Sequence, residues 1–466
     1  MSNQYNHFRL KEVSAPKYDN SGVPVFLSDE TMSERKNRIL QLMKENQLDT
    51  LVIYADVEHG GNFEYLTGFV PRFEEALLIL HQNEEAYLIL GNENLNKAKY
   101  SRIPAKPIHA PYFSLPNQPM ENTASFQELL VTAGIKKNSR VGIIGWKYFT
   151  SKLEDNRRLF DIPYFILSCI LRIVGHDANV QNRTGLFIGP EYGARTVNNA
   201  NEIAHYEFGS SLASDCVLKA MDELEPGITE MRLGSFLNAY GQPNSVVTIA
   251  AAGERFEKAN LYPTDKKVQV GDKISLTAGY KGGLSSRAGY AVSDKSQLPK
   301  GRGDYIEVLA APYFLSIAAW LENISVGMMG GDMYTLMDHI LPKEEYHWSL
   351  CPGHLTGDEE WMSSPIYAGS REILKSGMLL QVDIIPSKAG YAGAGAENGV
   401  ALANDKLKNQ IRNHYPELYQ RFMLRRQYME SVLGIRLSPD ILPLSSTVGY
   451  YRPFLLNKKL AFVQKV

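Results

Sequence analysis

Apolar and polar positions alternate with two different periods in the first third of the chain, which predicts helices and strands in turn. Residues 32–47 carry Ile39, Leu42 and Met43 at helical spacing and predict an amphipathic helix. Short apolar runs predict strands, with a polar hairpin turn between the second and the third, at residues 50–54, 76–80, 86–90 and 140–144. Strands of this kind with intervening helices predict a small α/β domain.

The pattern changes after residues 179–199, a polar, glycine-rich stretch that we interpret as a linker. A long helix is predicted at about 201–224, ended by the Pro226-Gly227 pair, and Thr229 is predicted to cap the next helix. Beyond it the pattern predicts an α+β half with strands at 246–250, 273–276, 378–385 and 400–403 and helices at 305–321, 333–340 and 406–432. We therefore predict an α/β domain at 1–185 and an α+β domain at 186–466 that ends in a helical tail. The sequence assigns that tail no role beyond amphipathic packing.

Charge and composition then exclude several classes of protein. The chain of 466 residues has 49 Lys and Arg against 51 Asp and Glu, so no overall basic field favours nucleic acid as a partner. The longest apolar run, residues 162–171, is about ten residues long and well short of the roughly 20 that span a bilayer. No signal segment is recognisable at the start, and three cysteines without a paired motif predict reduced thiols. We expect a cytoplasmic protein without membrane contact.

Short motifs follow one another in an order that resembles a known enzyme family. They are NFEYLTGF at 62–69, EPGITE at 225–230, GDKISLTAG at 271–279, GHLTG at 353–357, GMLLQVD at 377–383 and AENGV at 396–400. Over most of its length the chain resembles the family of creatinase, aminopeptidase P, prolidase and methionine aminopeptidase. The resemblance implies the pita-bread fold for the second domain. It also implies a homodimer in which Phe69, Arg72, Phe73 and Glu74 are candidates for the rim of the partner's pocket.

The same resemblance implies a site for two divalent metals, held in the family by two Asp, one His and two Glu. Carboxylate oxygens and an imidazole suit such ions, which activate the attacking water. His354 matches the histidine, Asp383 stands at the first glutamate with a shorter side chain, and Glu397 matches the second. The alternative for His354 and Glu397 is a capped or solvated side chain without a role.

The two positions that the resemblance assigns to metal-binding aspartates carry other residues in this chain. The first is Thr277, whose neutral hydroxyl is a poor bridging ligand, and the second is Arg287, which would repel a cation. A rival alignment makes Asp294 the second ligand. Three working histidines of the family are also replaced, by Leu261, Leu350 and Trp361.

These replacements predict a site that is balanced without metal. Arg287 and a protonated His354 would offset Asp383 and Glu397, and we expect Arg287 to pair with one of the two carboxylates, since buried charges need partners. We therefore expect no cofactor. The alternative is a single divalent metal bound by Asp294, His354, Asp383 and Glu397.

Three functions remain open, each with a small molecule or short peptide as ligand. The first is a metal-independent hydrolase or lyase that breaks a C–N bond in an amino-acid-like or guanidino substrate. For it we predict His354, Glu397, Asp383 and Arg287 as catalytic residues and Thr277, Tyr262 and Arg72 as substrate-binding residues. The second is a pseudoenzyme or ligand-binding module. The third is an Xaa-Pro aminopeptidase or prolidase with an atypical metal site, which would need Asp294 and a further Asp such as Asp272 or Asp265.

Overall fold

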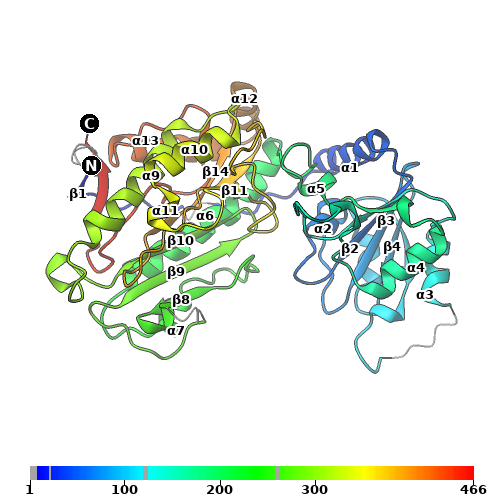
Figure 1. Ribbon diagram of the computed structural model, residues 1–466, viewed down its shortest axis with the longest axis horizontal. Coiled ribbons are helices and arrows are strands. Elements are labelled where there is room, and N and C mark those ends of the chain that lie inside the picture. Colours follow the sequence, from blue (N-terminus) through cyan, green and yellow to red (C-terminus); the bar gives the residue numbers. More distant parts are fainter. Residues whose placement is uncertain (1–7, 20–21, 119–123, 258–261, 466) are drawn as a thin grey trace. The chain divides into compact units, whose positions relative to one another are not determined.

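The computed structural model describes residues 8–19, 22–118, 124–257 and 262–465. They form two compact units, one of Leu27–Thr196 and one of Val197–Val466 together with the N-terminal residues up to Phe26. Residues 8–26 join the second unit because β1 (Phe8–Glu12) pairs antiparallel with β16 (Leu460–Gln464) in a two-stranded sheet (Figure 1). The division thus falls after Thr196, in contrast to the predicted boundary at 185, and residues 8–26 leave the α/β unit.

A six-stranded mixed sheet forms the centre of the Leu27–Thr196 unit. Its strands are β2 (Thr50–Ala55), β3 (Ala76–His81), β4 (Ala86–Leu90), β5 (Lys106–His109), β6 (Val141–Ile144) and β7 (Val180–Asn182). They lie in the order β5-β4-β3-β2-β6-β7, and β3 and β4 form the predicted antiparallel hairpin. All four strands predicted for this part are present, so the α/β assignment is confirmed here.

Helices cover this sheet. They are α1 (Asp29–Glu45), α2 (Gly61–Thr67), α3 (Phe126–Thr132), α4 (Tyr164–Val174) and α5 (Gly185–Ile188). Residues Phe126 and Ile170 of α3 and α4 pack in one core with Val52, Leu77 and Ile89 of the sheet. The apolar run at 162–171 is therefore mostly helix α4. Within the described part of the chain, no helix is both long and apolar enough to cross a membrane.

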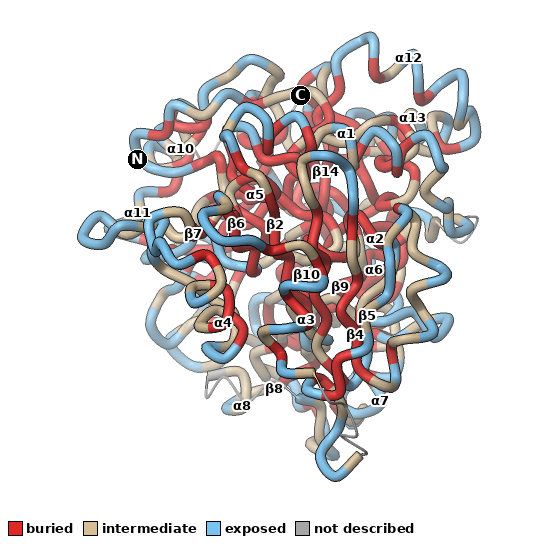
Figure 2. The backbone as a smooth tube through the Cα atoms, turned by 90° about the vertical axis from the view of Figure 1, so that its right-hand side faces the viewer, coloured by how far each residue is buried: buried red, intermediate tan, exposed pale blue. Residues whose placement is uncertain are grey.

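Two antiparallel sheets of four strands organise the other unit. The first contains β8 (Ile249–Ala252), β9 (Lys273–Tyr280), β10 (Gly283–Tyr290) and β13 (Gly395–Glu397), in the order β13-β10-β9-β8. The second contains β11 (His354–Leu355), β12 (Leu379–Gln381), β14 (Gly399–Leu402) and β15 (Ile441–Pro443), in the order β11-β12-β14-β15. Strands β9 and β10 are buried along most of their length (Figure 2).

The helices of this unit begin with α6 (Ala200–Glu223), which a capping box of Asn199 and Glu202 opens. The others are α7 (Glu230–Gly234), α8 (Glu254–Glu257), α9 (Ala311–Asn323), α10 (Gly330–Ile340), α11 (Lys343–Tyr346), α12 (Asp405–His414) and α13 (Pro416–Ser431). Thr229 caps α7 as predicted. The helix predicted at 406–432 is instead the pair α12 and α13, because a proline disfavours helical backbone at the residue before it, here Tyr415.

The α13 helix has a structural role that its sequence did not reveal. Glu207 of α6 is buried and accepts hydrogen bonds from Arg421 and Arg425 of α13, and Arg425 also pairs with Asp19 of the N-terminal segment. Burial by itself would raise the pKa of Glu207, but the two guanidinium groups outweigh it and hold that pKa below its ordinary value. This buried network joins α6, α13 and residues near the N-terminus.

Candidate functional site

One side of the candidate site is a row of side chains across the first sheet. Residues directly opposite each other in antiparallel strands project from the same face. Thr277 of β9 lies opposite Ser286 of β10, and Ser286 lies opposite Glu397 of β13. The hydroxyl oxygens of Thr277 and Ser286 are 2.7 Å apart and share a hydrogen bond. Glu397 is therefore the charged member of a row that otherwise carries two hydroxyls.

The other side comes from the second sheet. His354 of β11 is fully buried, and Asp383 follows two residues after the end of β12. Oδ2 of Asp383 lies 3.7 Å from Nε2 of His354. The two sheets thus bring His354, Asp383 and Glu397 to one place, as the motifs predicted.

Glu360 is a third carboxylate that the sequence analysis missed. It lies in the loop after β11, where its Oε1 is 3.0 Å from Nε2 of His354. Ligand atoms of His354, Glu360 and Glu397 all lie within 4.8 Å of one another. The signal was the acidic run at residues 358–360, close behind His354. We refer to His354, Glu360, Asp383 and Glu397 as the carboxylate cluster.

Two buried polar atoms of this cluster, Nε2 of His354 and Oδ1 of Asp383, have no hydrogen-bond partner among the residues that the structure describes. Glu360 approaches Nε2 closely, but outside the direction of a hydrogen bond. The indole of Trp361 stacks on the imidazole with ring centroids 3.9 Å apart and an angle of 22°. Trp361 is 38% exposed, so it separates His354 from solvent on that face.

The cluster carries more negative charge than its imidazole balances. Burial raises the pKa of Asp383 to about 6, with His354 lowering it and Glu360 raising it. Burial, Asp383 and Glu360 together raise the pKa of Glu397 well above its ordinary value, against the opposing effect of Arg287. Burial disfavours the imidazolium, but Glu360 and Asp383 outweigh it and raise the pKa of His354. The arrangement therefore favours uptake of positive charge.

The prediction that Arg287 pairs with Asp383 or Glu397 is wrong. Its guanidinium donates to the backbone carbonyl of Glu397, at 3.0 Å, and not to either carboxylate. The reason is the pleat of the sheet. Arg287 lies opposite Ala396, so its side chain projects from the face opposite to Glu397, and Ser286 is the residue of β10 that faces the cluster.

The rival ligand Asp294 is also wrong. It is exposed, and its carboxylate caps a short 3₁₀ helix by accepting from the backbone N–H of Ser296. Asp272 is a turn residue that pairs with Lys266 at 2.8 Å, and Asp265 is not in the group of ligating residues found in the described part of the chain.

The other predicted residues are scattered. Leu261 lies outside the described residues, and Tyr262 is 67% exposed, with its carbonyl accepting from Arg255. Arg72, in the other unit, is exposed. Substrate binding by Thr277, Tyr262 and Arg72 therefore stays a prediction.

The predicted rim residues differ in exposure. Phe73 is exposed and Phe69 is half-buried. Glu74 is buried beneath the backbone N–H groups of Glu93 and Asn94, which donate to its carboxylate, so the prediction that it lines a rim is wrong.

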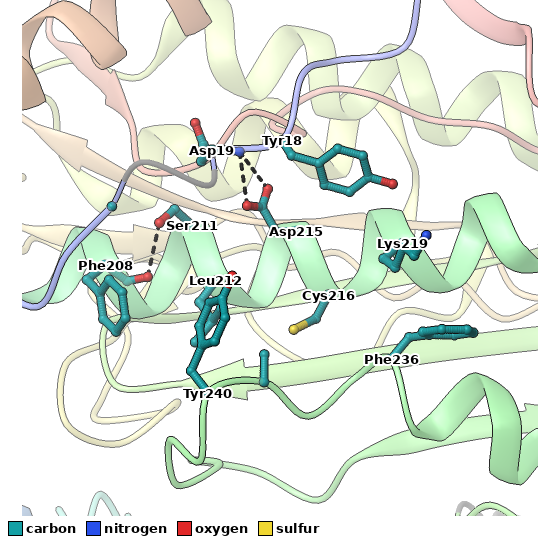
Figure 3. Close-up of a pocket in the computed structure, with 12 residues that line it drawn as sticks. Tyr18, Asp19, Phe208, Ser211, Leu212, Asp215, Cys216, Lys219, Phe236 and Tyr240 are labelled. Carbon is teal, nitrogen blue, oxygen red and sulfur yellow. Dashed lines mark hydrogen bonds between the residues drawn. The ribbon is translucent and has the colours of Figure 1, made fainter.

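A cavity of about 340 Å³ lies against α6, between that helix and the segments at residues 18–19 and 236–240 (Figure 3). Phe208, Leu212 and Phe236 give it apolar walls, and Asp215 accepts there from the backbone N–H of Asp19. None of the four cluster residues lines it. The cavity and the carboxylate cluster are therefore two separate features of this unit.

The residues present fit one divalent cation but not the pair that the resemblance implies. His354, Glu360 and Glu397 bring one imidazole and two carboxylates together, with Asp383 beside them, and this is the donor set of a single hard or borderline ion. A second ion would have to bind at Thr277 and Ser286. Their hydroxyls are neutral and already bonded to each other.

Comparisons with known proteins agree with this architecture. Residues 35–152 match the model of the Creatinase/Prolidase N-terminal domain. The Xaa-Pro dipeptidase from Bacillus anthracis is similar in structure, with a TM-score of 0.60 at 15% identity over 80% of this chain and 96% of that one. The chain has the pita-bread fold. The predicted resemblance and fold class are thereby confirmed.

Two further structures show the same fold. A prolidase from Thermococcus sibiricus has a TM-score of 0.62 at 15% identity and covers 81% of this chain and 95% of its own. An X-Pro aminopeptidase from Thermotoga maritima has a TM-score of 0.59 at 16% identity over 79% and 94%. No curated protein sequence matches the chain.

Proposed function

We propose that this pita-bread protein is a hydrolase of short peptides or related amides that uses a single divalent cation. His354, Glu360 and Glu397 would hold the cation, with Asp383 beside it. The observation that carries the proposal is the convergence of ligand atoms of His354, Glu360 and Glu397 within 4.8 Å of one another, together with Nε2 of His354, which is buried and has no hydrogen-bond partner among the described residues. It replaces the metal-independent reaction, which depended on an ion pair of Arg287 that does not form.

The cluster residues divide the work between binding and proton transfer. When bound, the cation would supply a Lewis acid that polarises the scissile carbonyl and makes water more acidic. Asp383 has an unpartnered Oδ1 and accepts a proton from the attacking water as general base. Trp361 shields one face of the imidazole from bulk water. Thr277 and Ser286 share a hydrogen bond in the row with Glu397, and whichever hydroxyl does not donate to the other would donate to a substrate oxygen.

The similar structures named above are Xaa-Pro peptidases, which supports short peptides as the first substrates to test. A small-molecule or short-peptide ligand and a homodimer are parts of this proposal, and analytical ultracentrifugation tests the second. A metal-dependent peptidase would also explain why residues from both sheets and the loop after β11 bring several carboxylates together at one place.

The test is metal-dependent turnover. The chelator-treated protein is assayed on a panel of Xaa-Pro and other dipeptides with Mn²⁺, Co²⁺ or Zn²⁺, alongside Glu360→Gln and the neighbouring Glu359→Gln as matched control. We expect turnover to return with one cation per chain, to be lost in Glu360→Gln and to persist in Glu359→Gln. Failure of the native protein to bind any of these cations would overturn the proposal.

A second candidate function is ligand binding without turnover. It is favoured by Leu350, which is exposed, and by Trp361, which stand where the family resemblance places working histidines. Peptides that bind to the loaded protein in calorimetry but are never cleaved would support this candidate against the hydrolase.

A further inference from the structure

Arg287 is a buried cation without an anionic partner. Its side chain is 1% exposed, and no carboxylate of any described residue lies within ion-pair distance of it. Its hydrogen bonds go to neutral oxygens, namely Ser286 O at 2.7 Å, Glu397 O at 3.0 Å, Asn398 Oδ1 at 2.6 Å, Thr447 O at 2.8 Å and Ser285 Oγ at 3.4 Å. Such acceptors bind the two terminal nitrogens, while Nε has no hydrogen-bond partner among the described residues, and none of them neutralises the charge, which is costly to bury alone.

The guanidinium lies directly behind the cluster. It binds the carbonyls of Ser286 and Glu397, and the side chains of these two residues project from the other face toward His354. Burial lowers the pKa of Arg287 to about 10, which leaves the group charged at neutral pH, and Glu397 is the carboxylate whose charge acts on it. The positive charge of Arg287 and the negative charge of the cluster therefore act on each other across the thickness of one sheet.

Formal charges then determine how many cations the site accepts. Glu360, Asp383 and Glu397 contribute three negative charges, and Arg287 contributes one positive charge. With His354 neutral as a ligand, two negative charges remain, and one divalent cation cancels them. A second divalent cation would leave two uncompensated positive charges in a buried site, which the interior disfavours.

We propose that Arg287 is a positioning residue that limits the carboxylate cluster to one divalent cation, since its fixed charge takes the place of a second. The inference rests on the function proposed above. The direction in which cation affinity changes when Arg287 is replaced distinguishes this role from a purely structural one. A residue that only braces β10 and β13 would weaken cation binding when replaced, whereas a residue that acts by charge strengthens binding when the charge is removed.

The experiment compares two replacements that both disturb the hydrogen bonds but differ by one charge, Arg287→Gln and Arg287→Lys. Mn²⁺ binding to the full-length, chelator-treated proteins is measured by isothermal titration calorimetry, and circular dichroism checks the fold. We expect one Mn²⁺ per native chain. We expect Arg287→Gln to bind Mn²⁺ at least about tenfold more tightly than Arg287→Lys, as one buried unit charge acting on a divalent ion requires.

Equal binding by the two variants, or weaker binding by Arg287→Gln, would overturn the inference and leave Arg287 a structural brace. The native protein supplies a second test if a variant fails to fold, because two Mn²⁺ bound with similar affinity would equally overturn it. If native protein binds no cation, both the proposed function and this inference fail. If it binds one and the variants do not differ, only the inference on Arg287 fails.

Discussion

Replacing Asp383 by Asn should stabilise the cation-free protein and weaken the stabilisation that a cation provides. The carboxylate is buried beside Glu360, and burial raises its pKa from 3.8 to about 6 although His354 opposes the shift. Asn keeps the shape of the side chain but carries no charge. The change therefore removes one repelling negative charge from the cluster and, at the same time, one group that attracts a cation.

The pKa shift of Asp383 determines how large the change in the free energy of unfolding should be. A rise from 3.8 to about 6 costs the folded state about 3 kcal/mol at pH 8, at 1.36 kcal/mol per unit. Between these two pKa values the folded state binds more protons than the unfolded one, so the free energy of unfolding decreases as pH rises through this window. The ionised Asp383 therefore destabilises the folded native protein above pH 6 and not below pH 3.8. Asp383→Asn carries no carboxylate here and is not destabilised in this way at any pH.

Urea unfolding followed by circular dichroism measures the effect. In EDTA at pH 8 we expect Asp383→Asn to be more stable than native protein by up to about 3 kcal/mol, narrowing to about 1 kcal/mol at pH 4.5. Mn²⁺ at a hundred times its Kd should add about 2.7 kcal/mol to the native protein and much less to the variant. With Mn²⁺ bound, the native protein should therefore become as stable as Asp383→Asn or more stable.

Asp294→Asn is the matched control, because it removes an exposed carboxylate that caps a 3₁₀ helix. It should change stability by about 1 kcal/mol at most and leave the Mn²⁺ effect intact. The reasoning is refuted if Asp383→Asn is less stable than native protein in EDTA at pH 8. Equal stabilisation of both proteins by Mn²⁺ would refute it as well.

Three further changes probe other parts of the molecule. Glu207→Gln breaks the buried pairs with the arginines of α13 and should lower the free energy of unfolding in urea by about 3–5 kcal/mol at pH 7. Because the pKa of Glu207 is lowered in the folded protein, its stabilising contribution is present above pH 4.5 and is lost as the pH falls through that lowered pKa. Cation binding at His354 should change the emission of Trp361, which is stacked on it, and Trp361→Phe should abolish that change. Thr277→Asp with Ser286→Asp adds two carboxylates to the row beside Glu397 and should raise Mn²⁺ binding from one to two per chain in calorimetry.

Each of these three predictions can be refuted by one result. A loss of less than 1 kcal/mol in Glu207→Gln would show that its buried pairs do not stabilise the fold. An undiminished fluorescence response in Trp361→Phe would place the cation elsewhere. A double aspartate variant that still binds a single Mn²⁺ would show that the row on β9 and β10 does not reach the cation.

The sequence determined a large part of the secondary structure and three members of the cluster. Apolar periodicity is a local property, so it located β2, β3, β4 and β6 of the first unit, β8, β9, β12 and β14 of the second and the long helix α6, but not the site strands β10 and β13. His354, Asp383 and Glu397 were recognisable because each lies in a short motif whose order the chain retains. The same reasoning placed Arg287 in the site, since an alignment counts residues along a strand and does not reveal which face each one occupies.

Only the tertiary structure decided which side chains meet. The pleat turns Arg287 away from the cluster and Ser286 toward it, a difference of one residue in register. Glu360 reaches His354 from a loop whose path no local pattern specifies. The segment at residues 8–12 pairs with residues 460–464 across nearly the whole chain. Such contacts depend on packing between distant segments, and so the charge balance of the site could be read only once the sheets were in place.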